Sequence, residues 1–177
     1  KALALDGRSL SALTGLASDA VWQGDAGAAL TLIDTARSQG QASEALRLVE
    51  ASAWLARGAP NDAEAALKNC DAVLAAQPDS AEARYLRGSA LLMLGRYADA
   101  QRAFDALVTS NRESPLGPYG LARLAAAQNR ATDALLYLRA AREAAPGAWV
   151  AAKVSADPAF AFVKTQPAFR DLLGATR

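Results

Sequence analysis

A small residue returns along this chain at a nearly fixed distance of 34 residues. One series is spaced by 34, 37 and 34 residues, and a second by 37, 34 and 34. The first series is Ala17, Ala51, Gly88 and Ala122, and the second is Ala29, Ala66, Ala100 and Ala134. Both belong to one repeat, of which one copy carries three extra residues between its two small positions. A period of 34 residues is typical of a helix-turn-helix unit that stacks on its neighbours, so the sequence predicts a helical solenoid.

The composition favours helices throughout the chain. Of the 177 residues, 52% are hydrophobic and 21% are charged, as in folded globular proteins. Alanine is abundant; it is the best helix former, and its small side chain lets two helices approach closely. Runs rich in Val, Ile and Thr, which favour strands, are absent. We therefore predict an all-α fold in a single domain over residues 1–177.

The copy at about residues 81–114 shows the pattern most clearly. Apolar residues at helical spacing run up to Gly95, a residue that favours the end of a helix. A second helix restarts near Tyr97 and carries one apolar stripe. That stripe consists of Ala100, Phe104, Leu107 and Val108. The preceding turn offers Asp79 or Ser80 as the N-cap of the first helix.

At these residues the chain resembles the tetratricopeptide repeat family. The family pattern has a small residue at position 8, often Gly at 15, an aromatic residue near 17, Ala at 20 and an aromatic residue at 24. The third copy matches with Gly88, Gly95, Tyr97, Ala100 and Phe104. It departs from the pattern at position 4, where Arg84 replaces Trp, and at position 32, where Arg112 replaces Pro. By the same register, the other copies span about residues 10–43, 44–80 and 115–148, and the three extra residues fall in a loop near Gly58. The resemblance therefore implies a right-handed superhelical solenoid of about four repeats.

The segment after the repeats, residues 149–177, has a different pattern. Asp157-Pro158 and Gln166-Pro167 each resemble the start of a helix, with Pro at the first helical position. The apolar residues around them are Phe160, Phe162, Phe169, Leu172 and Leu173. We predict short amphipathic helices that cap the open end of the stack; such a tail also resembles the end of many bacterial members of the family. Residues 1–9 show no comparable cap, and we expect them to fray or to follow another repeat or domain.

The residues that common catalytic and metal sites need are missing. The chain has no histidine, and its one cysteine, Cys70, cannot form an internal disulfide or a cysteine cluster. Cys70 falls on the buried stripe of its helix, so we expect an inert core thiol. The stretch from residue 24 to 27 lacks the pattern of a phosphate loop, and Asp99, Asp105 and Asp133 fall at solvent-facing helix positions. We therefore predict no enzyme activity, no cofactor and no metal.

The resemblance implies a binding site on the concave face of the solenoid. In this family the first helix of each repeat lines that face, mainly through positions 2, 5, 9, 12 and 13. By register, the predicted partner-binding residues are Thr14, Ser18, Leu48, Ser52, Leu55, Tyr85, Ser89, Leu92, Met93, Tyr119 and Arg123. This set lacks the clamp of Lys, Asn and Arg with which family members hold an acidic chaperone tail. Tyr85, Tyr119 and Arg123 favour a peptide or helix as ligand, although both tyrosines also suit packing between helices.

The resemblance implies a non-catalytic protein–protein interaction module that binds a peptide or helix of a partner protein. Two alternatives stay open. One is a self-associating scaffold of a bacterial envelope, secretion or pilus complex, to which Trp22 would contribute. The other is the regulatory part of a larger enzyme.

Charge and hydropathy narrow the choice of partners. The net charge is +1, and the chain has no basic stripe of the kind that follows a phosphate backbone, so we expect no nucleic acid partner. No apolar run approaches the roughly 18 residues of a membrane span, so we expect no membrane insertion. Because Met93 is the only methionine, we expect residues upstream of Lys1, where a targeting segment would lie, and both a cytoplasmic and a periplasmic location stay open. The bias towards Ala and Arg indicates a GC-rich bacterial genome.

Overall fold

The computed structural model describes residues 9–146 and 148–169, and within these ranges it contains helices and no strand. The first five α-helices are α1 (Leu10–Trp22), α2 (Ala26–Ser38), α3 (Glu44–Arg57), α4 (Asp62–Ala76) and α5 (Ala81–Met93). They are followed by α6 (Tyr97–Ser110), α7 (Leu116–Ala127), α8 (Ala131–Ala144) and α9 (Trp149–Ala156). Two short 3-10 helices, η2 (Pro158–Phe160) and η3 (Val163–Thr165), come next. The predicted all-α class is confirmed.

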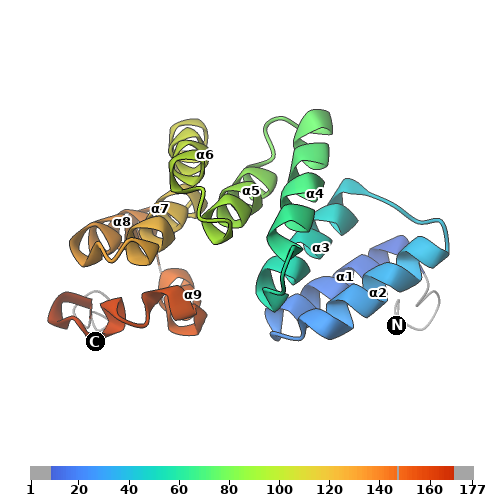
Figure 1. The fold of residues 1–177 in the computed structure, drawn as a ribbon, viewed down its shortest axis with the longest axis horizontal. Helices are drawn as coiled ribbons and strands as arrows, with labels where there is room; N and C mark the ends of the chain where they lie inside the picture. Colours follow the sequence, from blue (N-terminus) through green and yellow to red (C-terminus); the bar gives the residue numbers. More distant parts are fainter. Residues whose placement is uncertain (1–8, 147, 170–177) are drawn as a thin grey trace. The chain divides into compact units, whose positions relative to one another are not determined.

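The chain divides into two compact units, Lys1–Leu94 and Gly95–Arg177. In the first unit, α1 packs on α2 and α3 on α4, and contacts of α2 with α3 and of α4 with α5 continue the series (Figure 1). In the second unit, α6 packs on α7 and α7 on α8, while α9, η2 and η3 contact the α7–α8 pair. The boundary falls in the turn inside the third repeat. The single domain over residues 1–177 stays a prediction.

The small residues that define the repeat are all buried. They lie on helices that pack against neighbouring helices within each unit, and a small residue adds little bulk to such a buried helix face. The buried set is Ala17, Ala51, Gly88 and Ala122 on the first helices of the repeats, and Ala29, Ala66, Ala100 and Ala134 on the second. The sequence period therefore marks the contacts between helices.

Position 15 of every repeat ends its first helix with a left-handed backbone. Gly24, Gly58 and Gly95 have φ of 83°, 65° and 70°, and Asn129 takes the same position in the fourth repeat with φ of 56°. This region of φ favours glycine and, after it, asparagine. The substitution of Asn for Gly in the fourth copy therefore preserves the turn.

Four helices of the first unit are each preceded by a polar residue whose side chain caps the N-terminus of the helix. Each cap accepts a hydrogen bond from the backbone N–H three residues later, over 2.8 to 3.3 Å. The caps are Ser9, Asp25, Ser43 and Ser80 for α1, α2, α3 and α5. Of the two residues predicted as the cap of α5, Ser80 therefore serves.

Helix α3 joins two apolar clusters in the first unit. Leu13 and Ile33 pack with Leu46 of α3, and Leu86 packs with Leu48 on a neighbouring face of the same helix. Between these clusters α3 carries a glutamate, Glu50, that is only 1% exposed.

Polar contacts compensate the buried charge of Glu50. Arg37 of α2 donates to both of its carboxylate oxygens, and Asn69 of α4 donates to it as well. The amide of Asn69 also donates to the carbonyl of Arg47 over 3.2 Å. A buried carboxylate needs such partners, so this network fixes α2 and α4 against α3.

The loop that holds the three extra residues of the second repeat is closed by an ion pair. Arg57, the last residue of α3, donates to both oxygens of Asp62, the first residue of α4, over 2.9 and 2.6 Å. The backbone N–H of Ala59 donates to the same carboxylate over 2.8 Å. The hydrogen bonds from Arg57 hold the pKa of Asp62 below its usual value, so the loop ends at an ionised carboxylate paired with the end of α3.

In the second unit, α6 lies so close to α7 at two glycines that neither position has room for a Cβ. A Cβ added to Gly120 would lie 2.3 Å from Cδ1 of Phe104, and one added to Gly117 would lie 2.8 Å from Cγ2 of Val108. Phe104 is fully buried and forms part of the core of this unit. Phe104 of α6 therefore packs on α7 at Gly120, and Val108 packs on it at Gly117.

This contact predicts opposite effects of the same substitution at two helical glycines. We expect Gly120→Ala to lower the free energy of unfolding by roughly 1–3 kcal/mol, because Phe104 must move to make room for the methyl group. Gly15→Ala on α1, where no atom lies within 4 Å of the added Cβ, should raise it by up to about 1 kcal/mol through helix propensity. Urea denaturation followed by circular dichroism measures both changes, and equal effects of the two substitutions would contradict the close approach of α6 and α7.

Candidate functional site

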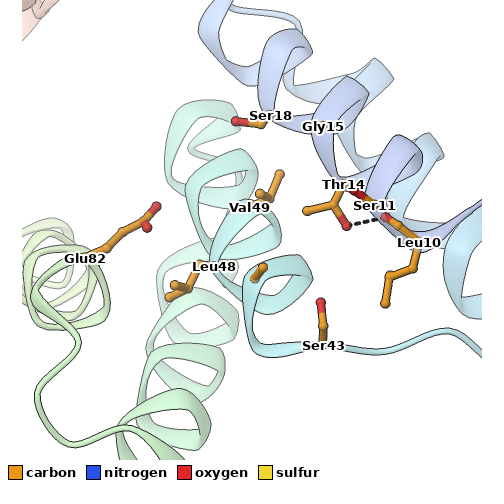
Figure 2. A pocket seen from close by; sticks show the side chains of 10 residues that line it. Leu10, Ser11, Thr14, Gly15, Ser18, Ser43, Leu48, Val49 and Glu82 are labelled. Carbon is orange, nitrogen blue, oxygen red and sulfur yellow. Dashed lines mark hydrogen bonds between the residues drawn. The ribbon is translucent and has the colours of Figure 1, made fainter. Parts of the chain in front are cut away.

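A pocket of about 630 Å³ lies on the first helices of the first three repeats. Its walls come from α1, from the start of α3, and from the first turn of α5 (Figure 2). We call it the first-helix pocket; α1 contributes Leu10, Ser11, Thr14, Gly15 and Ser18 to it. Its volume falls in the range of about 300–1,000 Å³ that ligand sites occupy.

Helix α3 forms the floor of the first-helix pocket and α5 forms its far side. Ser43, Ala45, Leu48 and Val49 line the pocket from the N-terminal part of α3, and Glu82 lines it from α5. Figure 2 shows Glu82 on the side of the pocket opposite α1. Because α3 packs against both α1 and α5, the three helices hold these side chains around one hollow.

The hydroxyl groups of the pocket differ in how they are already used. Thr14 donates its hydroxyl to the carbonyl of Leu10 over 2.6 Å, and Ser43 accepts from the N–H of Leu46 as the cap of α3. Ser11 and Ser18 lie exposed on α1. The lining thus combines apolar side chains with hydroxyl groups, and such a wall suits the backbone and apolar side chains of a peptide.

Three of the predicted partner-binding residues meet in the first-helix pocket, namely Thr14, Ser18 and Leu48. They stand at positions 5 and 9 of the first repeat and position 5 of the second. The residues missed by the prediction include Ser11, Ala45 and Glu82, which all stand at position 2 of their repeats. The repeat register contained this signal, because position 2 belongs to the concave face in the family pattern.

The other predicted residues of the first unit do not line this pocket. Ser52 is half-buried, Leu55 and Tyr85 pack partly buried against an apolar cluster, and Ser89 and Leu92 are buried. Met93 is 42% exposed, and its Cε lies 3.9 Å from the position of a Cβ on Gly58. Trp22 is 70% exposed at the end of α1. Contact of these residues with a partner stays a prediction.

The two predicted residues of the second unit contact the C-terminal segment of the same chain. Tyr119 is 3% exposed, and its hydroxyl donates to Oδ2 of Asp157 over 2.9 Å. Nε of Arg123 lies 2.9 Å from the same oxygen. The ring of Tyr119 meets Trp149 edge to face with centroids 5.5 Å apart, and Phe160 at 5.8 Å. Residues of α9 and η2, together with Asp157 between them, thus pack on the part of α7 that carries Tyr119 and Arg123. A partner role for these two residues stays a prediction.

The capping segment begins as its sequence predicts. Asp157 caps η2 by accepting from the N–H of Ala159 over 2.9 Å, and Pro158 is the first residue of that helix. After Pro167 the backbone is helical to Phe169. Leu172 and Leu173, the remaining predicted cap residues, lie outside the described residues, as do residues 1–8 at the other end.

Three of the residues considered as candidates for a catalytic or metal site are either buried in the core or paired on helix surfaces. Cys70 is fully buried, and burial raises the pKa of its thiol to about 12, so it is a protonated core side chain as predicted. Asp99 pairs with Arg96 over 2.6 Å and Asp133 with Arg130 over 3.1 Å on helix surfaces. Among the described residues, no group of His, Cys, Asp and Glu side chains is arranged to hold a metal ion. Within the same residues, no helix is long and apolar enough to span a membrane.

Comparison with known proteins adds one finding. A family model described as a tetratricopeptide repeat matches the chain at residues 59–118 and again at residues 94–148. The two overlapping matches together cover just over half of the chain. No curated protein matches it.

The contacts of Asp157 predict how strongly the capping segment is held. We expect Asp157→Ala to lower the free energy of unfolding by roughly 1–3 kcal/mol, because Tyr119 and the N–H of Ala159 lose their hydrogen-bond acceptors and the ion pair with Arg123 is lost as well. Asp133→Ala removes an exposed ion pair with Arg130 and should lower it by less than about 1 kcal/mol. Chemical denaturation of both variants measures the difference. A loss for Asp157→Ala no larger than that of its control would mean that the cap is held by apolar contacts alone.

Proposed function

Because the chain belongs to the tetratricopeptide repeat family, whose repeats generally serve as protein–protein interaction modules, we propose that it binds a segment of a partner protein in the first-helix pocket. The family is typically a non-catalytic interaction fold. The observation that carries the proposal is that equivalent positions of three successive repeats line one hollow. These are Ser11, Ala45 and Glu82.

The chemistry of the pocket supports a peptide segment as its occupant. Leu10, Leu48 and Val49 offer an apolar wall for one or two side chains, as at the centre of protein interfaces. Ser11 and Ser18 offer exposed hydroxyl groups to a peptide backbone. We expect an affinity on the order of micromolar, or about 8 kcal/mol, for a short segment in such a pocket.

Filling the pocket provides a test that leaves the fold intact. Gly15 lines the pocket, and no atom lies within 4 Å of an added Cβ, so Gly15→Leu places a bulky side chain where the partner would lie. Gly27→Leu is the matched control, because it introduces the same side chain on α2, outside the pocket. Random peptides displayed on phage and selected on the wild-type protein supply the ligands.

We expect Gly15→Leu to weaken the selected peptides at least about tenfold, which corresponds to ~1.4 kcal/mol, while Gly27→Leu binds them as the wild type does. Fluorescence anisotropy with labelled peptides measures the affinities, and thermal denaturation verifies that both variants are folded. If every selected peptide binds Gly15→Leu with unchanged affinity, the pocket is not the binding site.

One observation favours self-association as a second candidate function. Trp22 exposes 70% of its surface at the end of α1, and an exposed tryptophan is among the commonest anchors of protein interfaces. Under this hypothesis the chain would dock on a further copy through α1 and build a larger assembly. The third possibility, a regulatory part of a larger enzyme, stays a prediction.

Sedimentation of the wild type and of Trp22→Ser separates self-association from the monomeric binding module. Self-association predicts a mass that rises with concentration in the wild type and a weaker rise in the variant. A single monomeric species from low micromolar to near millimolar concentration would remove this candidate.

A further inference from the structure

We infer that the segment bound in the first-helix pocket carries a basic side chain, Lys or Arg, beside an apolar one, and that Glu82 receives the basic group. This deepens the binding role proposed above and rests on it. Glu82 is the single charged residue among those that line the pocket; the other lining residues are apolar, small or hydroxyl-bearing. A ligand that fills the pocket therefore meets one charge, and that charge is negative.

The position of Glu82 makes its carboxylate available to a ligand. Glu82 lies in the first turn of α5 and is exposed, and Figure 2 shows its side chain extending from α5 beside Leu48. Within the described residues it forms no ion pair. A cation that approaches along the apolar wall therefore reaches a carboxylate without having to displace an ion-pair partner from it.

The arginines closest in sequence to Glu82 are engaged elsewhere. Arg84 pairs with Asp79 over 3.1 Å, and Arg87 pairs with Asp71 over 2.7 Å. Neither arginine lines the pocket. Neither arginine therefore neutralises Glu82, and we expect the carboxylate of Glu82 to govern which charged ligands the pocket attracts.

The charge of the whole first unit has the same sign. Residues 1–94 contain eight Lys and Arg against eleven Asp and Glu, while the complete chain has a net charge of +1. The negative charge is thus concentrated in the unit that holds the pocket. Such a field favours the approach of a basic segment and disfavours an acidic one, most strongly at low ionic strength.

The apolar part of the pocket favours an apolar residue next to the basic residue of the bound segment. Leu10, Leu48 and Val49 form an apolar wall on the α1 and α3 sides, and Glu82 lies at the α5 side. A segment with a Leu, Ile, Val or Phe side chain next to Lys or Arg places each group against its complement. Arg has the further advantage of a planar guanidinium that pairs with both carboxylate oxygens at once.

Selection of random displayed peptides on the wild type, Glu82→Lys and Glu64→Gln tests the inference. Pocket-bound peptides are first identified as those whose affinity is lower for Gly15→Leu than for the wild type. We expect these peptides to be enriched in Lys or Arg beside an apolar residue when they are selected on the wild type. Selection on Glu82→Lys should lose this enrichment, because the charge that attracts the basic group is reversed.

Affinities of the pocket-bound peptides for Glu82→Gln and Glu64→Gln supply the matched comparison. Both glutamates are exposed and lie in the first turn of a helix, so both variants remove the same charge from an equivalent site. Glu82→Gln should weaken binding about threefold at low salt and less at high salt, and Glu64→Gln should not change it.

The two ways of failing are distinct. Pocket-bound peptides with no excess of Lys or Arg, or equal effects of Glu82→Gln and Glu64→Gln, would overturn the basic partner while the binding role stands. A selection that yields no peptide sensitive to Gly15→Leu would overturn the binding role itself.

Discussion

The close approach of consecutive helices is the constraint on which the rest of this structure depends. The α-helices of the described residues are 8 to 15 residues long, and segments of this length are marginal in water on their own. They are stabilised by packing on their neighbours within each unit, and the buried alanine or glycine at two positions of each repeat adds little bulk to the packed faces. In the second unit this goes one step further, because Phe104 packs directly on the backbone at Gly120. A single methyl group there would separate α6 from α7.

The same packing that builds the core of the first unit also positions the first-helix pocket, its candidate binding site. Helix α3 turns Leu46 and Leu48 towards two apolar clusters and Glu50 towards a buried polar network. The N-terminal part of α3, with Ala45 and Val49, contributes to the floor of the first-helix pocket. Because α3 is held from several sides, the pocket is built on regular helices whose relative positions the core fixes. Such a site requires little ordering when a ligand binds.

The part of the candidate site that could be predicted is the part that follows from the position of each residue in its repeat. Thr14, Ser18 and Leu48 followed from their register positions, and Glu82 was within reach of the same argument because it stands at position 2. The register does not say what packs on the last repeat. Tyr119 occupies the same position in the fourth repeat as Thr14 does in the first, but it packs against the C-terminal segment through Asp157, Trp149 and Phe160. A side chain at a groove position is open to a ligand only where no later segment of the chain packs on it. For Tyr119 the packing residues lie some 30 to 40 positions later in the sequence.

The sequence by itself determined the all-α class and the burial of the small repeat residues, because these follow from local helical periodicity and from turn residues such as Gly95. The limits of the repeats stay a prediction. Membership of the tetratricopeptide repeat family rests on the same periodic pattern. Only the tertiary structure decided that the pocket gathers on α1, α3 and α5, that Glu82 is its charged residue and that Asp157 holds the cap on α7. Those features depend on which side chains meet across helices. The sequence pattern fixes the face of a helix but not which elements pack against that face.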